Sequence, residues 1–259
     1  MIFFRKRLTD TLVEAYEKRL LSKIAKNEVP KHVAIIMDGN RRYAEKLGLD
    51  PMEGHSLGRD KLEELVDWCL EIGIKILTVY AFSTENLKRE KKELDALMKL
   101  FTVNFRKAGD DYRIHKNKIR IRALGQVSLL PNDLQDAIRY AEERTKDYTN
   151  YFFNIAIAYG GRDDILNAVR NIANDVKDGK IEIKDIDENT VSKYLYTKEL
   201  PDPDLILRTS GEERISNFLL WQLAYSELYF SDVYWPEFKK ADFLRAIIAY
   251  QRRQRRFGE

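Results

Sequence analysis

Six short apolar segments, separated by stretches of helical periodicity, constrain the fold of this chain more than any other feature. The apolar segments are bounded by Gly, Pro or polar clusters, as buried strands are. They span residues 33–37, 74–82, 119–124, 152–158, 205–207 and 227–230. Strands that alternate with helices predict an α/β fold, with an open, mostly parallel six-stranded sheet, right-handed connections and helices on both faces.

Helical patterns lie between most of these strands, at residues 58–72, 90–116, 132–146, 163–176 and 188–196, with a further helix at each end, 9–26 and 241–256. No Pro/Ser-rich linker, low-complexity tract or internal repeat divides the chain, and 259 residues suffice for one large core. We therefore predict a single domain over residues 31–259, preceded by an N-terminal helical extension over residues 1–30.

Charge and cysteine content exclude several classes of protein. Lys plus Arg (45) nearly balances Asp plus Glu (42), so the net charge of +3 does not describe a nucleic-acid binder. The single cysteine, Cys69, has apolar neighbours and is expected to be buried in a reducing compartment. No run of about eighteen apolar residues and no signal peptide is present, which predicts a cytoplasmic protein. The N-terminal segment 2–7 has the pattern of a membrane-surface contact or of an ordinary helix start.

Polar and cationic residues follow four of the predicted strands. The segments are DGNRRY at 38–43, STEN at 83–86, YGGR at 159–162 and RTSGE at 208–212. In a parallel sheet, ligands bind outside the carboxyl ends of the strands. The sequence therefore predicts that these four loops converge on one site.

The first of these loops has the residue types of a diphosphate and Mg²⁺ site. Asp38 ends a strand, Gly39 lets the backbone approach a ligand, and Arg41 and Arg42 stand at the start of a helix, where backbone N–H groups favour anions. Mg²⁺ takes one or two carboxylates together with phosphate oxygens and waters, so Asp38 alone is a sufficient protein ligand. The alternative is that Asp38 only caps the helix and that the arginines are solvated.

A second basic loop carries Arg208, Arg214 and Ser216, and two arginines can bind phosphate in bidentate fashion. Two basic loops on one edge predict two anionic substrates or one large one. Surface ion pairs with Glu212 and Glu213 are the alternative for either arginine taken singly.

Several other polar residues are ambiguous on sequence alone. Glu227 lies in apolar sequence, where a carboxylate needs an ion pair or a metal. His55 is expected to bind phosphate or to cap a helix, and Asn86 to position a proton acceptor or to be an ordinary loop amide. The predicted helix 90–116 carries an apolar stripe that indicates either core or the wall of an apolar tunnel: Leu94, Leu97, Met98, Phe101 and Phe105.

Four segments together resemble one known family. HVAIIMDGNRRYA (32–44), YAFSTEN (80–86), AYGGRDDI (158–165) and DLILRTSGEERISNFLLWQLAYSELYF (204–230) are similar to the signature regions of the cis-prenyltransferases, the undecaprenyl diphosphate synthases. The resemblance runs from about residue 32 to the C-terminus. It implies a Mg²⁺-dependent homodimeric enzyme with an apolar tunnel, which condenses isopentenyl diphosphate with an allylic diphosphate to make the precursor of a glycosyl carrier lipid.

The resemblance also implies a role for each matching residue. Asp38 would hold Mg²⁺ and assist departure of the allylic diphosphate, with Glu227 as a second metal-site residue and Asn86 helping to remove the proton. The residues implied to bind the allylic diphosphate or to flank the reaction centre are Gly39, Asn40, Arg41, Arg42, Tyr43, His55, Ser83, Thr84, Glu85, Leu87 and Arg89. Arg208, Arg214, Ile215 and Ser216 match the isopentenyl diphosphate site, and Arg256 and Gly258 match a C-terminal element that contacts the partner's site.

Two departures from the bacterial pattern refine this prediction. Pro51 replaces an arginine that helps to bind the allylic diphosphate, and Leu87 replaces a tryptophan. We expect Arg41, at a position that is often glycine, to compensate for the first change. The DGNRRYA variant resembles archaeal and eukaryotic members, which favours a geranylgeranyl primer over a farnesyl one and a long polycis product. Peripheral membrane contact would then serve product release.

Two rival functions fit the sequence less well. A non-catalytic subunit of a prenyltransferase complex would lack the metal aspartate and the RTSGE arginine, whereas this chain has both, at Asp38 and Arg208. A phosphatase or phosphate-binding α/β protein would carry a nucleophilic Cys, Asp or Ser motif, which this sequence does not show. The chain also lacks the DDxxD motif of the all-helical trans-prenyl synthases.

Overall fold

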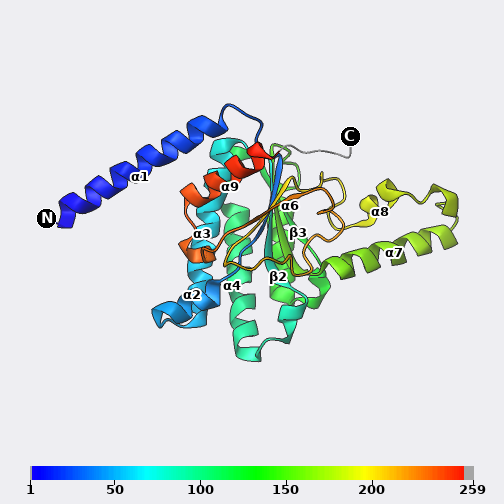
Figure 1. Ribbon diagram of the computed structural model, residues 1–259. Helices are drawn as coiled ribbons and strands as arrows, with labels where there is room; N and C mark the ends of the chain where they lie inside the picture. The colour runs from blue at the N-terminus through cyan, green and yellow to red at the C-terminus, as the bar shows by residue number, and fades with distance from the viewer. Residues whose placement is uncertain (1, 254–259) are drawn as a thin grey trace.

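A six-stranded parallel sheet forms the centre of the molecule (Figure 1). The computed structural model describes residues 2–253, and the side chains of residues 11–253. The strands are β1 (His32–Ile36), β2 (Ile76–Ser83), β3 (Ile119–Leu124), β4 (Tyr151–Tyr159), β5 (Leu205–Arg208) and β6 (Glu227–Phe230), in the order β3-β4-β2-β1-β5-β6. Every neighbouring pair is parallel, which confirms the predicted α/β class.

The helices follow the predicted pattern, with differences at α1, which begins seven residues earlier, at α2, which had no predicted range, and at α3 and α4. They are α1 (Ile2–Ile24), α2 (Asn40–Leu47), α3 (Pro51–Ile72), α4 (Lys91–Asp110), α5 (Tyr112–Asn117), α6 (Asn132–Thr145), α7 (Gly161–Lys177), α8 (Glu188–Tyr194) and α9 (Lys240–Arg252). Helix α3 begins seven residues earlier than predicted, because Asp50 and Glu53 form a capping box around Pro51. The single helix predicted over 90–116 is wrong: Asp111 ends α4, and its side chain accepts a hydrogen bond from the Arg113 N–H to start α5.

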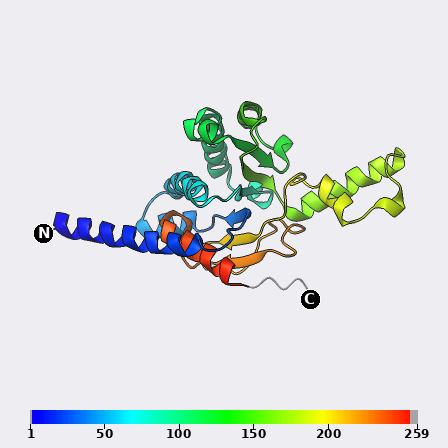
Figure 2. The same cartoon turned by 90° about the horizontal axis from the view of Figure 1, so that it is seen from above.

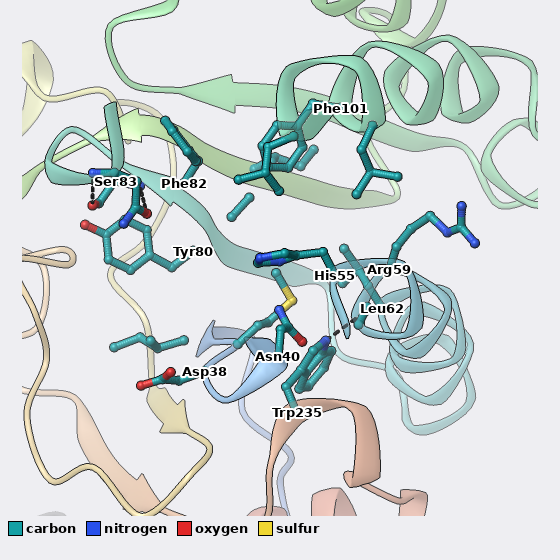
Figure 3. Close-up of a pocket in the computed structure, with 18 of the residues that line it drawn as sticks. Asp38, Asn40, His55, Arg59, Leu62, Tyr80, Phe82, Ser83, Phe101 and Trp235 are labelled. Carbon is teal, nitrogen blue, oxygen red and sulfur yellow. Dashed lines mark hydrogen bonds between the residues drawn. The ribbon is translucent and has the colours of Figure 1, made fainter. Parts of the chain in front are cut away.

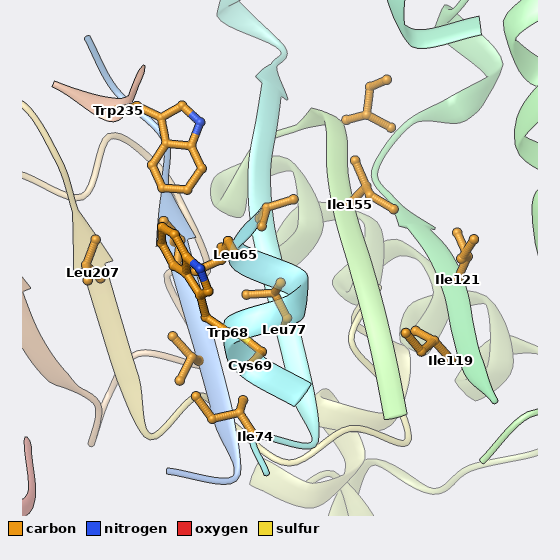
Figure 4. Close-up of a cluster of buried hydrophobic side chains, with 14 of the residues drawn as sticks. Leu65, Trp68, Cys69, Ile74, Leu77, Ile119, Ile121, Ile155, Leu207 and Trp235 are labelled. Atoms are coloured by element: carbon orange, nitrogen blue, oxygen red, sulfur yellow. The ribbon is translucent and has the colours of Figure 1, made fainter. Parts of the chain in front are cut away.

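Alternate side chains along the strands pack into two separate hydrophobic cores. Val33 and Ile35 of β1 belong to the larger core, with apolar side chains of α3, α4, α6 and α9. Figure 4 shows part of this core, with Leu65 and Trp68 of α3 beside the sheet. Ala34 and Ile36 face the other way, towards Phe218 of the irregular segment 209–226. The predicted helical cover therefore holds for the larger face, while a loop segment supplies much of the smaller core. Cys69 is buried in the larger core, as predicted, and burial raises the pKa of its thiol.

Two elements project from this body on opposite sides. Helix α1 runs outward from α9, and α7 extends with α8 beside it (Figures 1 and 2). At its inner end α1 buries Leu20 and Ile24, whereas Leu12 and Val13 are exposed farther out. Within the part of the chain that the structure describes, no helix is both long and apolar enough to cross a membrane.

Candidate active site

A cavity of about 800 Å³ opens at the carboxyl ends of β1, β2 and β5 and runs between the sheet, α3 and α4. Figure 3 shows labelled side chains from these elements surrounding one space, with Asp38 from the loop after β1, Ser83 from the end of β2, and Phe101 from α4. One end is charged; we call it the cavity mouth, formed by Asp38, Arg41, Arg42, His55, Arg89 and Arg208. The other end is apolar.

Asp38 lies at the cavity mouth and accepts hydrogen bonds from two arginines. Its Oδ2 accepts a hydrogen bond of 2.7 Å from Arg208, and its Oδ1 accepts one of 3.0 Å from Arg42. Burial raises the pKa of Asp38, but the hydrogen bonds and charges of Arg208 and Arg42 outweigh it, so the pKa lies below its ordinary value. Asp38 does not cap α2, since Gly39 is the N-cap, which rules out the simpler alternative.

Arg208 is the most buried cation of the cavity mouth, with a side chain that is 5% exposed. One terminal nitrogen binds Asp38; the other donates to the Ser216 hydroxyl at 2.8 Å and to the Arg214 carbonyl. Its Nε is buried without a hydrogen-bond partner. An unsatisfied guanidinium N–H at a cavity wall is costly unless a ligand accepts from it, which favours an anionic ligand here.

The loop after β5 takes a backbone shape that few residues adopt easily. Ser210, Ser216, Asn217 and Leu219 all have positive φ, between 46° and 76°. Such conformations cost free energy and cluster at functional sites, where the surrounding structure maintains them. Gly39 opposite is also constrained, because its φ is 103° and a Cβ there would lie 2.7 Å from the Tyr234 ring.

Two glycines of α3 let α2 approach closely. A Cβ on Gly54 would lie 2.2 Å from the Asn40 carbonyl oxygen, and one on Gly58 would lie 2.3 Å from Asn40 Oδ1. Trp235 closes the same corner, with its indole N–H donating to the Gly58 carbonyl at 2.7 Å and its backbone N–H to the Asp38 carbonyl at 3.0 Å. The side-chain oxygen of Asn40 is left buried without a partner inside the cavity wall.

The loop after β2 forms a tight turn beside the mouth. The Asn86 Oδ1 accepts from the Ser83 N–H at 3.0 Å, and the Ser83 hydroxyl accepts from the Asn86 N–H at 3.2 Å. Glu85 accepts from the Asn217 side chain at 3.0 Å, so this turn is tied to the loop after β5. The predicted loops after β1, β2 and β5 therefore all contribute to the cavity, whereas no residue of the predicted loop 159–162 lines it.

The apolar end of the cavity lies between α3, α4 and β4. It is lined by Leu62, Phe82, Leu97, Leu100, Phe101, Phe105, Ala108, Phe153 and Ile155. Both interpretations of the apolar stripe on α4 are correct in part. Leu97 and Phe105 line the cavity and are buried in the core, while Met98 serves the core alone.

Most, not all, of the predicted site residues line this cavity. Those that line it are Asp38, Gly39, Asn40, Arg41, Arg42, His55, Ser83, Glu85, Asn86, Arg89, Arg208 and Ser216. Tyr43, Thr84, Leu87, Arg214 and Ile215 are outside that lining. Leu87 packs against the core, and Arg214 forms the simple ion pair with Glu212 that was its alternative. Arg256 and Gly258 lie outside the described residues.

The structure does not bring Glu227 and Asp38 together within one chain. Glu227 is the first residue of β6 and pairs with Leu205, at the amino end of β5, whereas Asp38 contacts Arg208 at the carboxyl end. The Glu227 carboxylate binds Arg253 at 2.7 Å. Within one chain the ion pair that was the alternative for Glu227 is present, and its role as a second metal-site residue stays a prediction.

Sequence reasoning missed three residues at the site. Asn217 lines the cavity and joins three loops, since its side chain also accepts from the Arg162 N–H and its carbonyl from the Gly161 N–H. Trp235 had no sequence signal beyond its size. Glu93 did have one, because it follows Arg89 by four residues, the spacing of an ion pair on a helix.

The donor set fits Mg²⁺ only if the ligand also contributes oxygens. Among residues 11–253, no group of three or more His, Cys, Asp and Glu side chains is gathered as a metal cage. A single ionised carboxylate beside phosphate-binding arginines is the kind of site where Mg²⁺ takes its remaining ligands from phosphate and water. Asp38, with its lowered pKa, meets that requirement.

A parallel α/β domain with a charged cavity mouth and an apolar depth suits a substrate with a diphosphate head and a hydrocarbon tail, and the comparisons with known proteins agree. The sequence pattern of the family described as "Putative undecaprenyl diphosphate synthase" matches residues 36–258. The chain therefore belongs to this family of prenyltransferases.

Individual relatives narrow the comparison. The chain is 56% identical, over 99% of its length and 92% of the relative's, to the tritrans,polycis-undecaprenyl-diphosphate synthase (geranylgeranyl-diphosphate specific) of Methanocaldococcus jannaschii. It is 57% identical, over 97% of its length and 98% of the relative's, to the protein of the same name in Thermoplasma volcanium. The crystal structure of lavandulyl diphosphate synthase from Lavandula x intermedia with dimethylallyl diphosphate superposes with a TM-score of 0.85 at 41% identity, covering 89% of this chain and 99% of that one.

Proposed function

We propose that this chain condenses isopentenyl diphosphate repeatedly with geranylgeranyl diphosphate to give a long polycis-polyprenyl diphosphate, the precursor of a glycosyl carrier lipid. The observation that carries the proposal is the cavity, whose mouth gathers arginines around Asp38 and whose depth is apolar. The names of the archaeal relatives support geranylgeranyl diphosphate rather than farnesyl diphosphate as the primer.

The two substrates would occupy different sides of Asp38. Arg41, Arg42, His55 and Arg89 would bind the allylic diphosphate, with its hydrocarbon in the apolar end of the cavity. Arg208, with Ser216, would bind the diphosphate of isopentenyl diphosphate. Its unpartnered Nε supplies a donor that a phosphate oxygen satisfies.

In the proposed reaction, the allylic C–O bond breaks and the diphosphate leaves with the bonding electrons. The terminal double bond of isopentenyl diphosphate then attacks the allylic carbon, and a proton is lost to form the new cis double bond. The arginines of the cavity mouth stabilise the charge on the departing diphosphate, an effect that is strong in a partly dry site. The Asn86 amide, held by Ser83 at the cavity wall, would orient the group that accepts the proton.

Mg²⁺ dependence is part of the same proposal. Asp38 would hold the ion together with diphosphate oxygens and waters, and the bound ion supplies further charge neutralisation for the leaving diphosphate. Arg42 and Arg208 donate hydrogen bonds to Asp38 in this structure. When substrate binds, they would donate some of these hydrogen bonds to its phosphate oxygens instead.

We extend the proposal to a cytoplasmic homodimer with peripheral membrane contact for product release. Support for a dimer comes from α7, which projects from the body and exposes Leu166 and Val169 one turn apart. Arg253, the last described residue, binds both Glu227 and the Leu228 carbonyl and so lies beside Glu227. In a dimer, Glu227 and the residues after Arg253 would serve the partner's site rather than their own.

The test is incorporation of labelled isopentenyl diphosphate, with geranylgeranyl and farnesyl diphosphates supplied in competition and product length measured. We expect long-chain product mainly from geranylgeranyl diphosphate, lost on addition of EDTA and restored by Mg²⁺. Absence of any extractable polyprenyl product, with both primers and with Mg²⁺ present, would refute the proposed function.

A further inference from the structure

Three cavity-lining groups converge on a carboxylate that does not itself line the cavity. Glu93, in the first turn of α4, binds Arg89 at 2.7 Å, lies 3.7 Å from Arg41 and lies 3.8 Å from His55 Nε2. These partners come from α2, from α3 and from the end of the loop after β2. The Glu93 side chain is only 18% exposed. One buried carboxylate thus joins three elements behind one half of the cavity mouth.

Two of the partners of Glu93, Arg41 and Arg89, need such a carboxylate, because their guanidinium groups would otherwise repel one another. Arg41 and Arg89 both act on His55: together with burial, which is the larger effect, they lower the pKa of its imidazole to about 4, and Glu93 opposes them. Like charges within one partly buried cluster are unfavourable unless a counter-charge lies among them. The place of Glu93 in the first turn of α4 adds stabilisation from the helix dipole.

The cluster also leaves ligand-binding capacity unused. His55 Nε2 is buried and has no hydrogen-bond partner, and its 3.8 Å distance from Glu93 is too long for a hydrogen bond. The Arg41 side chain is half-exposed at the cavity. Glu93 therefore contacts these groups while His55 Nε2 and part of the Arg41 side chain remain free to bind a ligand in the cavity.

We infer that Glu93 is a positioning residue for the allylic diphosphate: it holds Arg41, His55 and Arg89 in a preorganised arrangement from behind, without touching the substrate. The inference rests on the proposed assignment of this half of the cavity mouth to the allylic diphosphate. Preorganised donors bind an anion more tightly, because less conformational entropy is lost when it arrives. Glu93 is thus a specific determinant of affinity for one of the two substrates.

The test compares four variants in steady-state kinetics: Glu93→Gln, Arg89→Gln, the double variant, and Asp95→Asn as a control. Asp95→Asn makes the same change of charge at an exposed position of the same helix. We expect Glu93→Gln to raise KM for geranylgeranyl diphosphate about tenfold, the usual effect of removing such a supporting partner. We expect KM for isopentenyl diphosphate to stay within about twofold and Asp95→Asn to behave as wild type. Because Glu93 acts partly through Arg89, its substitution should have a smaller effect in the Arg89→Gln background.

The outcomes separate this inference from the proposed function. If Arg89→Gln raises the allylic KM and Glu93→Gln leaves it unchanged or lowers it, the positioning role is wrong and the site assignment stands. A merely structural role would lower the melting temperature and shift kcat and both KM values together, which also overturns the inference. If Arg89→Gln itself has no effect on the allylic KM, the assignment of this half of the mouth fails, and the inference with it.

Discussion

Buried polar side chains are hydrogen-bonded at the amino ends of the strands but are left partly unpaired at the carboxyl ends, and two histidines show this difference most clearly. At the amino end of β1, His32 is fully buried and both ring nitrogens are bonded, Nδ1 to the Pro201 carbonyl at 2.7 Å and Nε2 to the Thr78 hydroxyl at 2.8 Å. At the carboxyl edge, His55 is also largely buried, but its Nε2 has no partner. Burial lowers the pKa of each histidine to about 4.

The difference teaches which edge serves the fold and which serves the ligand. Three buried polar atoms without partners lie at the cavity, in Asn40, His55 and Arg208. By contrast, the Asp204 carboxylate at the amino edge accepts from the backbone N–H groups of Lys31 and His32. An unsatisfied donor such as the Arg208 Nε–H costs stability, and a bound anion that accepts from it restores that stability.

The largest effect is expected at Asp38. Asp38→Asn keeps the size of the side chain and removes the charge that Arg42 and Arg208 share. We expect turnover of isopentenyl diphosphate to fall by about 10³-fold, the upper range for loss of one charge-stabilising group. Radiolabel incorporation, with circular dichroism to check folding, measures this, and near-normal turnover would contradict the role of Asp38.

The two histidines should separate stability from binding. His32→Ala leaves the Thr78 hydroxyl and the Pro201 carbonyl without the ring, and should lower the free energy of unfolding by about 3 kcal/mol. His55→Ala should change the free energy of unfolding by less than about 1 kcal/mol but raise the allylic KM about tenfold. Urea unfolding and steady-state kinetics on both variants test the comparison, and the reverse pattern would break it.

Stability should also depend on pH in a direction fixed by His32. Its pKa is lowered from 6.5 to about 4 by burial, so between these values the unfolded chain binds a proton that the folded chain does not. The contribution of His32 is fully present above pH 6.5 and is lost as the pH falls towards 4, by about 3 kcal/mol. Urea unfolding at several pH values should show this loss in wild type and a weaker one in His32→Gln; equal pH dependence would exclude His32 as the cause.

A substitution in the apolar end of the cavity should have the smallest effect on the reaction rate, but it should change the length of the product. Ala108 lines the cavity on α4, and Ala108→Phe should shorten the product while changing the rate of the first condensation by less than about threefold. Val103→Phe is the control, since Val103 is exposed on the same helix. Thin-layer chromatography of the products measures chain length, and identical products from both variants would show that the cavity does not hold the chain.

The fold and most of the cavity mouth followed from local patterns in the sequence. Strand periodicity placed six strands, and the rule that ligands bind at their carboxyl ends brought Asp38, Ser83 and Arg208 to one edge. The prediction that grouped Glu227 with Asp38 did not apply this rule, under which Glu227 begins its strand whereas Asp38 follows one. The capping box around Pro51 was also readable, as Asp50 precedes it and Glu53 follows at the required spacing.

Other features depend on tertiary contacts that no local pattern encodes. Asn217 and Trp235 acquire their roles from chain segments far away in sequence, through Glu85 and Gly58. The apolar pattern is continuous across Asp111, but the Asp111 side chain caps a new helix by accepting from the Arg113 N–H, and this local hydrogen bond ends α4 there. The contacts of Glu93 with Arg41 and His55 likewise exist only once α2, α3 and α4 are packed.

The most direct test of the central claim is the geometry of the double bonds that the enzyme makes. Purified protein would receive geranylgeranyl diphosphate, ¹³C-labelled isopentenyl diphosphate and Mg²⁺, and the extracted polyprenyl product would be analysed by NMR. The account predicts that every labelled, newly formed internal double bond is cis. Labelled trans double bonds, or no elongation of the primer, would contradict it.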